Sequence, residues 1–172
     1  LLEFGRIGRG AIRLQPISVP QMVDSCRRTL QHEIRATEAH IAVSEGQTVL
    51  CADPILLKVG LSNLLANALK FVTPGTVPHV TIAASVTPGG CRLSVEDNGI
   101  GIAPEHQARI FQPFVRLHGV EEYSGFGLGL AAVQKAVELM GGRVGVTSAL
   151  GRGSMFWMDL GRPEVGNEVL NC

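Results

Sequence analysis

The chain lacks an excess of charge of either sign. Among its 172 residues, 15 Lys and Arg balance 15 Asp and Glu, so the formal net charge is zero. Proteins that bind nucleic acid or an acidic membrane surface through charge usually carry a basic excess. The balance therefore argues against both kinds of partner, and the length fits one domain with a short appendage.

Paired cysteines and long apolar runs are also missing. Cys26, Cys51, Cys91 and Cys172 are far apart and form no Cys-x-x-Cys pair, which argues against a zinc site or a disulfide framework and favours reduced thiols. No apolar run approaches the roughly 18 residues of a membrane span, and no signal peptide is visible. From the reduced thiols and the missing apolar run we expect a cytoplasmic location without membrane contact. Because the chain starts at Leu1 and not Met, we expect it to be a piece of a longer protein.

Glycine, by contrast, is abundant in one region. The chain has 21 glycines, and eleven of them fall between Gly99 and Gly153 without the three-residue period of collagen. With 45% hydrophobic residues the chain can bury a real core, so the excess needs a local explanation.

Hydrophobic periodicity predicts three main helices. The first covers 21–37, with Val23, Cys26, Leu30 and Ile34 on one side. The second covers 53–72 and opens with Asp53 as N-cap before a proline. The third runs from about 127 to 140.

Strands are predicted at 13–19, 40–44, 48–52, 79–86, 91–97, 142–148 and 154–160. In strand 79–86 the residues Val80, Ile82, Ala84 and Val86 share one face. Because tight turns join the later strands in pairs, we expect an α/β (α+β) two-layer sandwich rather than a doubly wound parallel sheet. Its mixed, mostly antiparallel sheet of about five strands would pack against three helices.

Three places could carry chemistry. Asn63, Asn67 and Lys70 share a face of the second helix and could hold a metal and phosphate oxygens, or simply form a solvated face. Asp97 is in phase with inward-facing residues, so its carboxylate needs a donor. That donor could be a backbone N–H of the next turn or an exocyclic amine, such as that of adenine.

The third place is Gly125-Phe126-Gly127-Leu128-Gly129-Leu130, at the start of the third helix, where free N–H groups could bind an anion. This glycine segment does not match the GxGxxG motif, which excludes a dinucleotide-binding fold. The GxxxxGK[ST] motif is also absent from the sequence, which excludes a P-loop. Taken alone, Gly151-Arg152-Gly153-Ser154 is best explained as a hairpin turn.

The order of five motifs is far more specific than any one of them. They are NLLANALKF (63–71), EDNGIGI (96–102), FQPFVRL (111–117), GFGLGLA (125–131) and GRGSMF (151–156). Together they resemble the catalytic ATP-binding domain of sensor histidine kinases, in particular of the phytochrome type, in the superfamily of gyrase-type, heat-shock-chaperone and mismatch-repair ATPases. The resemblance covers 12–161; residues 1–11 resemble the end of a dimerisation helix and a linker, and 162–172 form a C-terminal tail.

The resemblance implies a binding site for ATP (or ADP) and Mg²⁺. Asp97 would accept a hydrogen bond from the adenine amine, Asn67 would coordinate Mg²⁺ and Lys70 would contact phosphate. Phe71 would pack on the base or sugar. The other implied nucleotide contacts are Gly99, Gly101, Ile102, Gly125, Gly127, Leu128, Gly129, Leu130 and Ser154.

The implied catalytic residues are Asn63 and Arg116. Arg116 would neutralise charge on the transferring phosphoryl group, within a mobile ATP lid (103–126) anchored by Phe111 and Phe114. Hydrolysing relatives carry glutamate at the position of Asn63. Because an amide cannot take a proton from water, ATP should be held here for another nucleophile. In the family this nucleophile is a histidine of the dimerisation domain; His32 lies too close to Asn63 to be that residue.

The resemblance therefore implies a protein-histidine kinase domain of a homodimeric two-component kinase. It would phosphorylate a histidine outside this chain, and the phosphate would pass to a response regulator. Alone it should not autophosphorylate. One departure leaves an alternative open: Phe126 stands where Ser or Thr is usual, so a nucleotide-binding regulatory module (pseudokinase or anti-sigma-like) is also considered. A stand-alone ATPase is disfavoured by Asn63.

Overall fold

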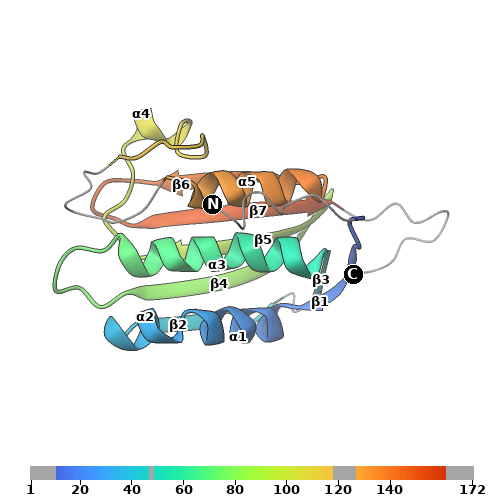
Figure 1. Ribbon diagram of the computed structural model, residues 1–172, viewed down its shortest axis with the longest axis horizontal. Coiled ribbons are helices and arrows are strands. Elements are labelled where there is room, and N and C mark those ends of the chain that lie inside the picture. Colours follow the sequence, from blue (N-terminus) through green and yellow to red (C-terminus); the bar gives the residue numbers. More distant parts are fainter. Residues whose placement is uncertain (1–10, 47–48, 118–126, 162–172) are drawn as a thin grey trace.

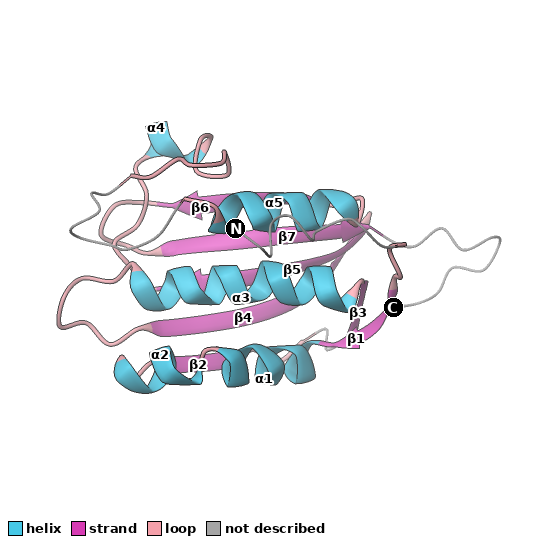
Figure 2. Ribbon diagram, viewed as in Figure 1, coloured by secondary structure: helices cyan, strands magenta, loops and turns pink. Residues whose placement is uncertain are grey.

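A computed structural model describes residues 11–46, 49–117 and 127–161 of the chain as a sheet covered by helices on one face (Figures 1 and 2). The sheet has five strands in the order β2-β4-β5-β7-β6, and only the β2–β4 pair is parallel. The strands are β2 (His40–Val43), β4 (His79–Thr87), β5 (Gly90–Asp97), β6 (Arg143–Ser148) and β7 (Ser154–Gly161). The expected mixed, mostly antiparallel sheet of five strands is confirmed.

A second, two-stranded sheet lies beside the first. In it β1 (Gln15–Ser18) pairs antiparallel with β3 (Val49–Ala52). The longer helices α1 (Val19–Thr29), α3 (Pro54–Lys70) and α5 (Gly129–Leu139) run side by side, with α3 in the middle (Figure 1). Two short helices, α2 (Gln31–Ala36) and α4 (Pro104–Gln107), complete the described elements.

The first predicted helix is in fact two. Leu30, at φ −103° and ψ 19°, separates α1 from α2, so a continuous helix over 21–37 was wrong. The apolar stripe nevertheless passes through the bend, because Leu30 is buried and Ile34 packs against the core. The backbone bonds Leu30 N–H to Cys26 O and Ile34 N–H to Leu30 O keep the two segments connected.

The central helix is fixed at its start by the predicted cap. Asp53 Oδ1 accepts hydrogen bonds from the N–H groups of Ile55 and Leu56, at 2.9 and 3.1 Å. Its Oδ2 accepts a third from the N–H of Arg13 at 3.0 Å, which ties the incoming chain to the helix. Because α3 lies between two helices and above the sheet, it buries residues around much of its circumference: Leu56, Leu57, Gly60, Leu61, Leu64, Leu65, Ala68 and Leu69.

The hairpin of β4 and β5 carries the inner face of the sheet. Val80, Ile82 and Ala84 are buried as expected, and Ile82 lies opposite Val95 on β5. Val86 differs from the expectation: it is 61% exposed, one residue before the ladder ends, and adds little to the core. No helix among the described residues is long and apolar enough to cross a membrane.

Candidate functional site

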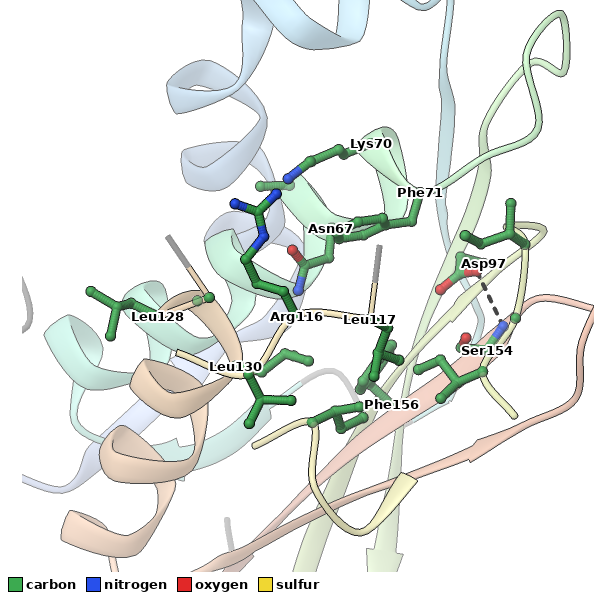
Figure 3. A pocket seen from close by; sticks show the side chains of 18 residues that line it. Asn67, Lys70, Phe71, Asp97, Arg116, Leu117, Leu128, Leu130, Ser154 and Phe156 are labelled. Atoms are coloured by element: carbon green, nitrogen blue, oxygen red, sulfur yellow. Dashed lines mark hydrogen bonds between the residues drawn. The ribbon is translucent and has the colours of Figure 1, made fainter. Parts of the chain in front are cut away.

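A cavity of about 390 Å³ opens between α3, the start of α5 and the ends of β5 and β7 (Figure 3). Predicted site residues from all five motifs meet in its wall. They are Asn67, Lys70, Phe71, Asp97, Gly101, Ile102, Arg116, Gly127, Leu128, Gly129, Leu130 and Ser154. The fold thus brings together segments that are up to 87 positions apart in the sequence, from Asn67 to Ser154.

Apolar residues that the sequence reasoning did not single out complete the wall. These are Ala66, Ile100, Ile110, Val115, Leu117 and Phe156. All but Ile110 lie inside the five motifs. The sequence could therefore have indicated them as the apolar positions of those motifs. They give the cavity a largely apolar lining, which suits a flat ring system better than a fully hydrated ion.

Asp97 stands at one end of the cavity. Its Oδ1 accepts hydrogen bonds from the N–H groups of Gly99, at 2.8 Å, and Ser154, at 3.1 Å. Burial raises the pKa of this carboxyl above its usual range, which outweighs the lowering effect of the two N–H donors, and the Glu96 carboxylate raises it further. Both bonds go to Oδ1, so Oδ2 is the oxygen available to a donor in the cavity.

The turn after Asp97 packs so closely that it requires glycine. Gly101 has φ +72°, and a Cβ there would collide with the backbone of Ala149. A Cβ at Gly99 would collide with the carbonyl oxygen of Phe71. Gly101 lines the cavity, whereas Gly99 is not part of the wall and contributes through its N–H, which donates to Asp97.

Two cations face the opposite end of the cavity (Figure 3). Lys70 Nζ lies 4.6 Å from the centroid of the Phe71 ring. Burial lowers the pKa of Lys70, and the positive charge of Arg116 lowers it further. Asn67 projects into the cavity next to both, so this end offers positive charge and an amide oxygen. Like charges placed this close are stabilised by an anion between them.

The first turn of α5 adds backbone donors to the wall. Gly127, Leu128, Gly129 and Leu130 line the cavity, and within the described part of the chain no side chain caps the helix start. Its first N–H groups have no partner within the helix, so they and the helix dipole favour negative charge. This glycine segment was predicted as an anion site, and its described part reaches the cavity.

Besides Gly99, two predicted residues do not reach the cavity wall or cannot be placed. Asn63 Nδ2 donates to the carbonyl oxygen of Val59 at 2.9 Å, and its Oδ1 would lie 3.1 Å from a Cβ at Gly129. Asn63 therefore supports the glycine segment from α3 and does not line the cavity. Gly125 lies outside the described residues, as does Phe126, on which the regulatory alternative depends.

The segment predicted as a lid is described up to residue 117. Phe111 packs edge-on against Phe156, with ring centroids 6.4 Å apart, as an anchor should. Phe114 does not: it is 72% exposed, because its positive φ of 65° turns the side chain outward. Its N–H instead donates to the carbonyl oxygen of Gly127 at 2.9 Å, so the backbone joins the segment to the start of α5.

The donor set fits a metal that arrives with a ligand. Among the described residues, no group of three His, Cys, Asp or Glu could hold a metal ion. Mg²⁺ is commonly bound by one or two protein oxygens together with phosphate oxygens and water. The amide oxygen of Asn67, beside the cationic end, could supply such a ligand.

Known proteins resemble this chain in sequence. The family model of "Histidine kinase-, DNA gyrase B-, and HSP90-like ATPase" matches residues 52–164. Cyanobacterial phytochrome A of Nostoc sp. strain PCC 7120 is 36% identical over 160 residues, covering 93% of this chain and 21% of that protein. The circadian input-output histidine kinase CikA of Synechococcus elongatus is 36% identical over 166 residues, covering 91% of this chain and 22% of that protein. The chain spans about a fifth of the length of these curated relatives.

Solved structures share the fold. Full-length ShkA in complex with AMPPNP matches with a TM-score of 0.74 and 36% identity, over 92% of this chain and 34% of that one. The mycobacterial sensor histidine kinase MprB matches with a TM-score of 0.71 and 27% identity, over 88% and 99%. The chain therefore belongs to the histidine kinase-, DNA gyrase B- and HSP90-like ATPase family and is homologous to the catalytic domains of histidine kinases, including those of phytochrome type.

Proposed function

We propose that residues 12–161 bind ATP with Mg²⁺ and present its γ-phosphoryl group to a histidine of a separate dimerisation domain. One observation carries this proposal: a carboxylate acceptor, Asp97, and two cations, Lys70 and Arg116, face opposite ends of one apolar cavity. A molecule with an amine-bearing ring at one end and a polyphosphate at the other satisfies both ends. Adenosine nucleotides have this chemistry.

At the base end, Asp97 accepts from the exocyclic amine and the apolar wall packs on the ring. At the other end, Lys70 and the first N–H groups of α5 bind the phosphates. The amide oxygen of Asn67 would hold Mg²⁺, which when bound would neutralise part of the phosphate charge. Arg116 neutralises the charge that develops on the transferring group.

Asn63 supports transfer to another nucleophile over hydrolysis. Its amide cannot accept a proton, and its Nδ2 is already bonded to the backbone of Val59. No general base is therefore present at this position to activate water. Bound ATP instead reacts with a histidine of the dimerisation domain. The isolated chain is accordingly inactive in autophosphorylation.

The relatives support the wider proposal. CikA is named as a histidine kinase, and ShkA was solved with AMPPNP. By analogy, this chain acts in the cytoplasm within a homodimeric kinase that passes phosphate from histidine to a response regulator receiver domain. No nucleic acid takes part.

The test mixes the chain with a separately made dimerisation domain and γ-labelled ATP in Mg²⁺. We expect label on the histidine of the added domain and none on the chain alone. Nucleotide binding without phosphohistidine would favour the regulatory module. Phosphate release by the chain alone would favour a stand-alone ATPase. A chain that binds no nucleotide would be neither a histidine kinase domain nor an ATPase.

A further inference from the structure

Three side chains form a row across the end of the sheet. Asp97 ends β5, Ser154 begins β7 and Ser148 ends β6; Asp97 lies opposite Ser154, and Ser154 lies opposite Ser148. Asp97 and Ser154 line the cavity (Figure 3), whereas Ser148 is not part of the cavity wall. Nothing in the motifs assigns a role to Ser148.

The hydroxyl of Ser148 has three close partners. Its Oγ lies 2.8 Å from the N of Ile102, 2.7 Å from the carbonyl oxygen of Gly153 and 2.9 Å from the Oγ of Ser154. A serine hydroxyl has one proton and two acceptor lone pairs. All three of its hydrogen-bonding positions are therefore used.

The chemistry of the partners fixes the direction of each bond. The Gly153 carbonyl can only accept, so the single proton of Ser148 goes to it. The Ile102 N–H can only donate, so it occupies one lone pair of Ser148. The remaining bond can form only if the Ser154 hydroxyl donates to Ser148. The proton of Ser154 thus points away from the cavity.

We propose that Ser148 is a positioning residue that makes the base end of the cavity accept protons only, and thereby selects a 6-aminopurine over a 6-oxopurine. Ser154, with its proton held by Ser148, offers lone pairs to the cavity, and Oδ2 of the Asp97 carboxylate faces the cavity as a second acceptor. An amino group donates to such a wall, whereas a 6-oxo group would set acceptor against acceptor. The proposal rests on the proposed nucleotide function and deepens it.

Gln107 holds Ser148 in this arrangement. Its Nε2 donates to the carbonyl oxygens of Ile102, at 3.0 Å, and Ser148, at 2.8 Å. Both protons of the Gln107 amide are used. They tie the backbone of Ser148 to the backbone of Ile102, the residue whose N–H donates to the Ser148 hydroxyl. The position of the hydroxyl is therefore set from the backbone as well as from its three partners.

The test compares the Kd of ADP with that of IDP, which carries a 6-oxo group. For the wild-type chain we expect IDP to bind about tenfold or more weakly than ADP. Ser148→Ala releases the Ser154 hydroxyl, which can then turn and donate, so this ratio should fall about three- to tenfold.

Two further variants control the result. Ser148→Thr keeps the hydroxyl and should keep the wild-type ratio, as should Thr147→Ala on the exposed face of the same strand. An unchanged ratio in folded Ser148→Ala overturns the proposal. If that variant does not fold, Ser154→Ala decides in its place, because it removes the lone pairs and leaves the other bonds of Ser148 intact; an unchanged ratio there also overturns it. Failure of the wild-type chain to bind ADP would instead reject the proposed function.

Discussion

The backbone N–H of Ser154 donates to Oδ1 of Asp97 at 3.1 Å, although the two residues are 57 positions apart. Together with the N–H of Gly99, this bond holds one carboxylate oxygen and leaves the other for the cavity. The base end of the site is therefore built by the pairing of β5 with β7 and not by a local turn alone.

Asp97→Asn tests the base end directly. The amide can still accept the two N–H bonds at Oδ1, but its NH₂ group would face the amine of adenine, donor against donor. We expect ADP affinity to fall about 10- to 100-fold in isothermal titration calorimetry. Asp24→Asn, on the exposed surface of α1, is the matched control and should bind normally. Wild-type affinity in folded Asp97→Asn would contradict the assignment.

The same variant has an opposite effect on stability without ligand. Because the pKa of Asp97 is raised on folding, the folded chain binds its proton more tightly than the unfolded chain does. The contribution of this carboxyl to stability is greatest below its unfolded pKa and is lost as pH rises through the folded pKa. At pH 7 Asp97→Asn should therefore raise Tm by a few °C at most. A lower Tm would show that the ionised form is net favourable here.

Arg116→Gln and Lys70→Met test the phosphate end. Each removes one of two neighbouring cations, so ATP should bind about tenfold more weakly while adenosine affinity stays unchanged. Arg109→Gln, an exposed position on the same segment as Arg116, serves as the control. An equal loss for ATP and adenosine would place these side chains at the base and not at the phosphates.

Gly101→Ala separates backbone strain from collision. Gly101 has φ +72°, and a Cβ there would collide with Ala149. Gly151 has a similar φ of +71° but open space around a Cβ. In urea unfolding, Gly151→Ala should cost about 1 kcal/mol and Gly101→Ala about 2 kcal/mol more, because only the second must move the backbone. Equal losses of unfolding free energy in the two variants would mean that the backbone at Ala149 moves aside at no cost.

Gln107→Glu should be worse than Gln107→Ala. Glutamate replaces two N–H donors with a charge that faces the carbonyl oxygens of Ile102 and Ser148. We expect a loss of about 1 kcal/mol of unfolding free energy for alanine and about 2–3 kcal/mol for glutamate. Glu105→Gln, exposed on the same short helix, should be neutral by the same urea titration. Equal stability of the two Gln107 variants would contradict a stabilising role for the two hydrogen bonds that Gln107 donates.

Local patterns predicted most elements because local forces produce them. The Asp53 cap and the β4–β5 hairpin depend on neighbours in sequence, and both appear as predicted. The bend at Leu30 has no such local signal, since the apolar spacing continues across it. The exposure of Val86 near the end of its ladder and of Phe114 at a positive φ likewise depends on features that periodicity does not contain.

The sequence by itself determined the family, through the order of five motifs, and placed Asp97 inward through strand parity. Only the tertiary structure decided that Asn63 lies beside Gly129 and not in the cavity wall, that Lys70 and Arg116 share one end of the cavity, and that the hydroxyls of Ser148 and Ser154 meet. The reason is physical. Motifs record which residues a site needs, whereas hydrogen-bond direction and charge proximity depend on distances between strands and helices that only folding sets.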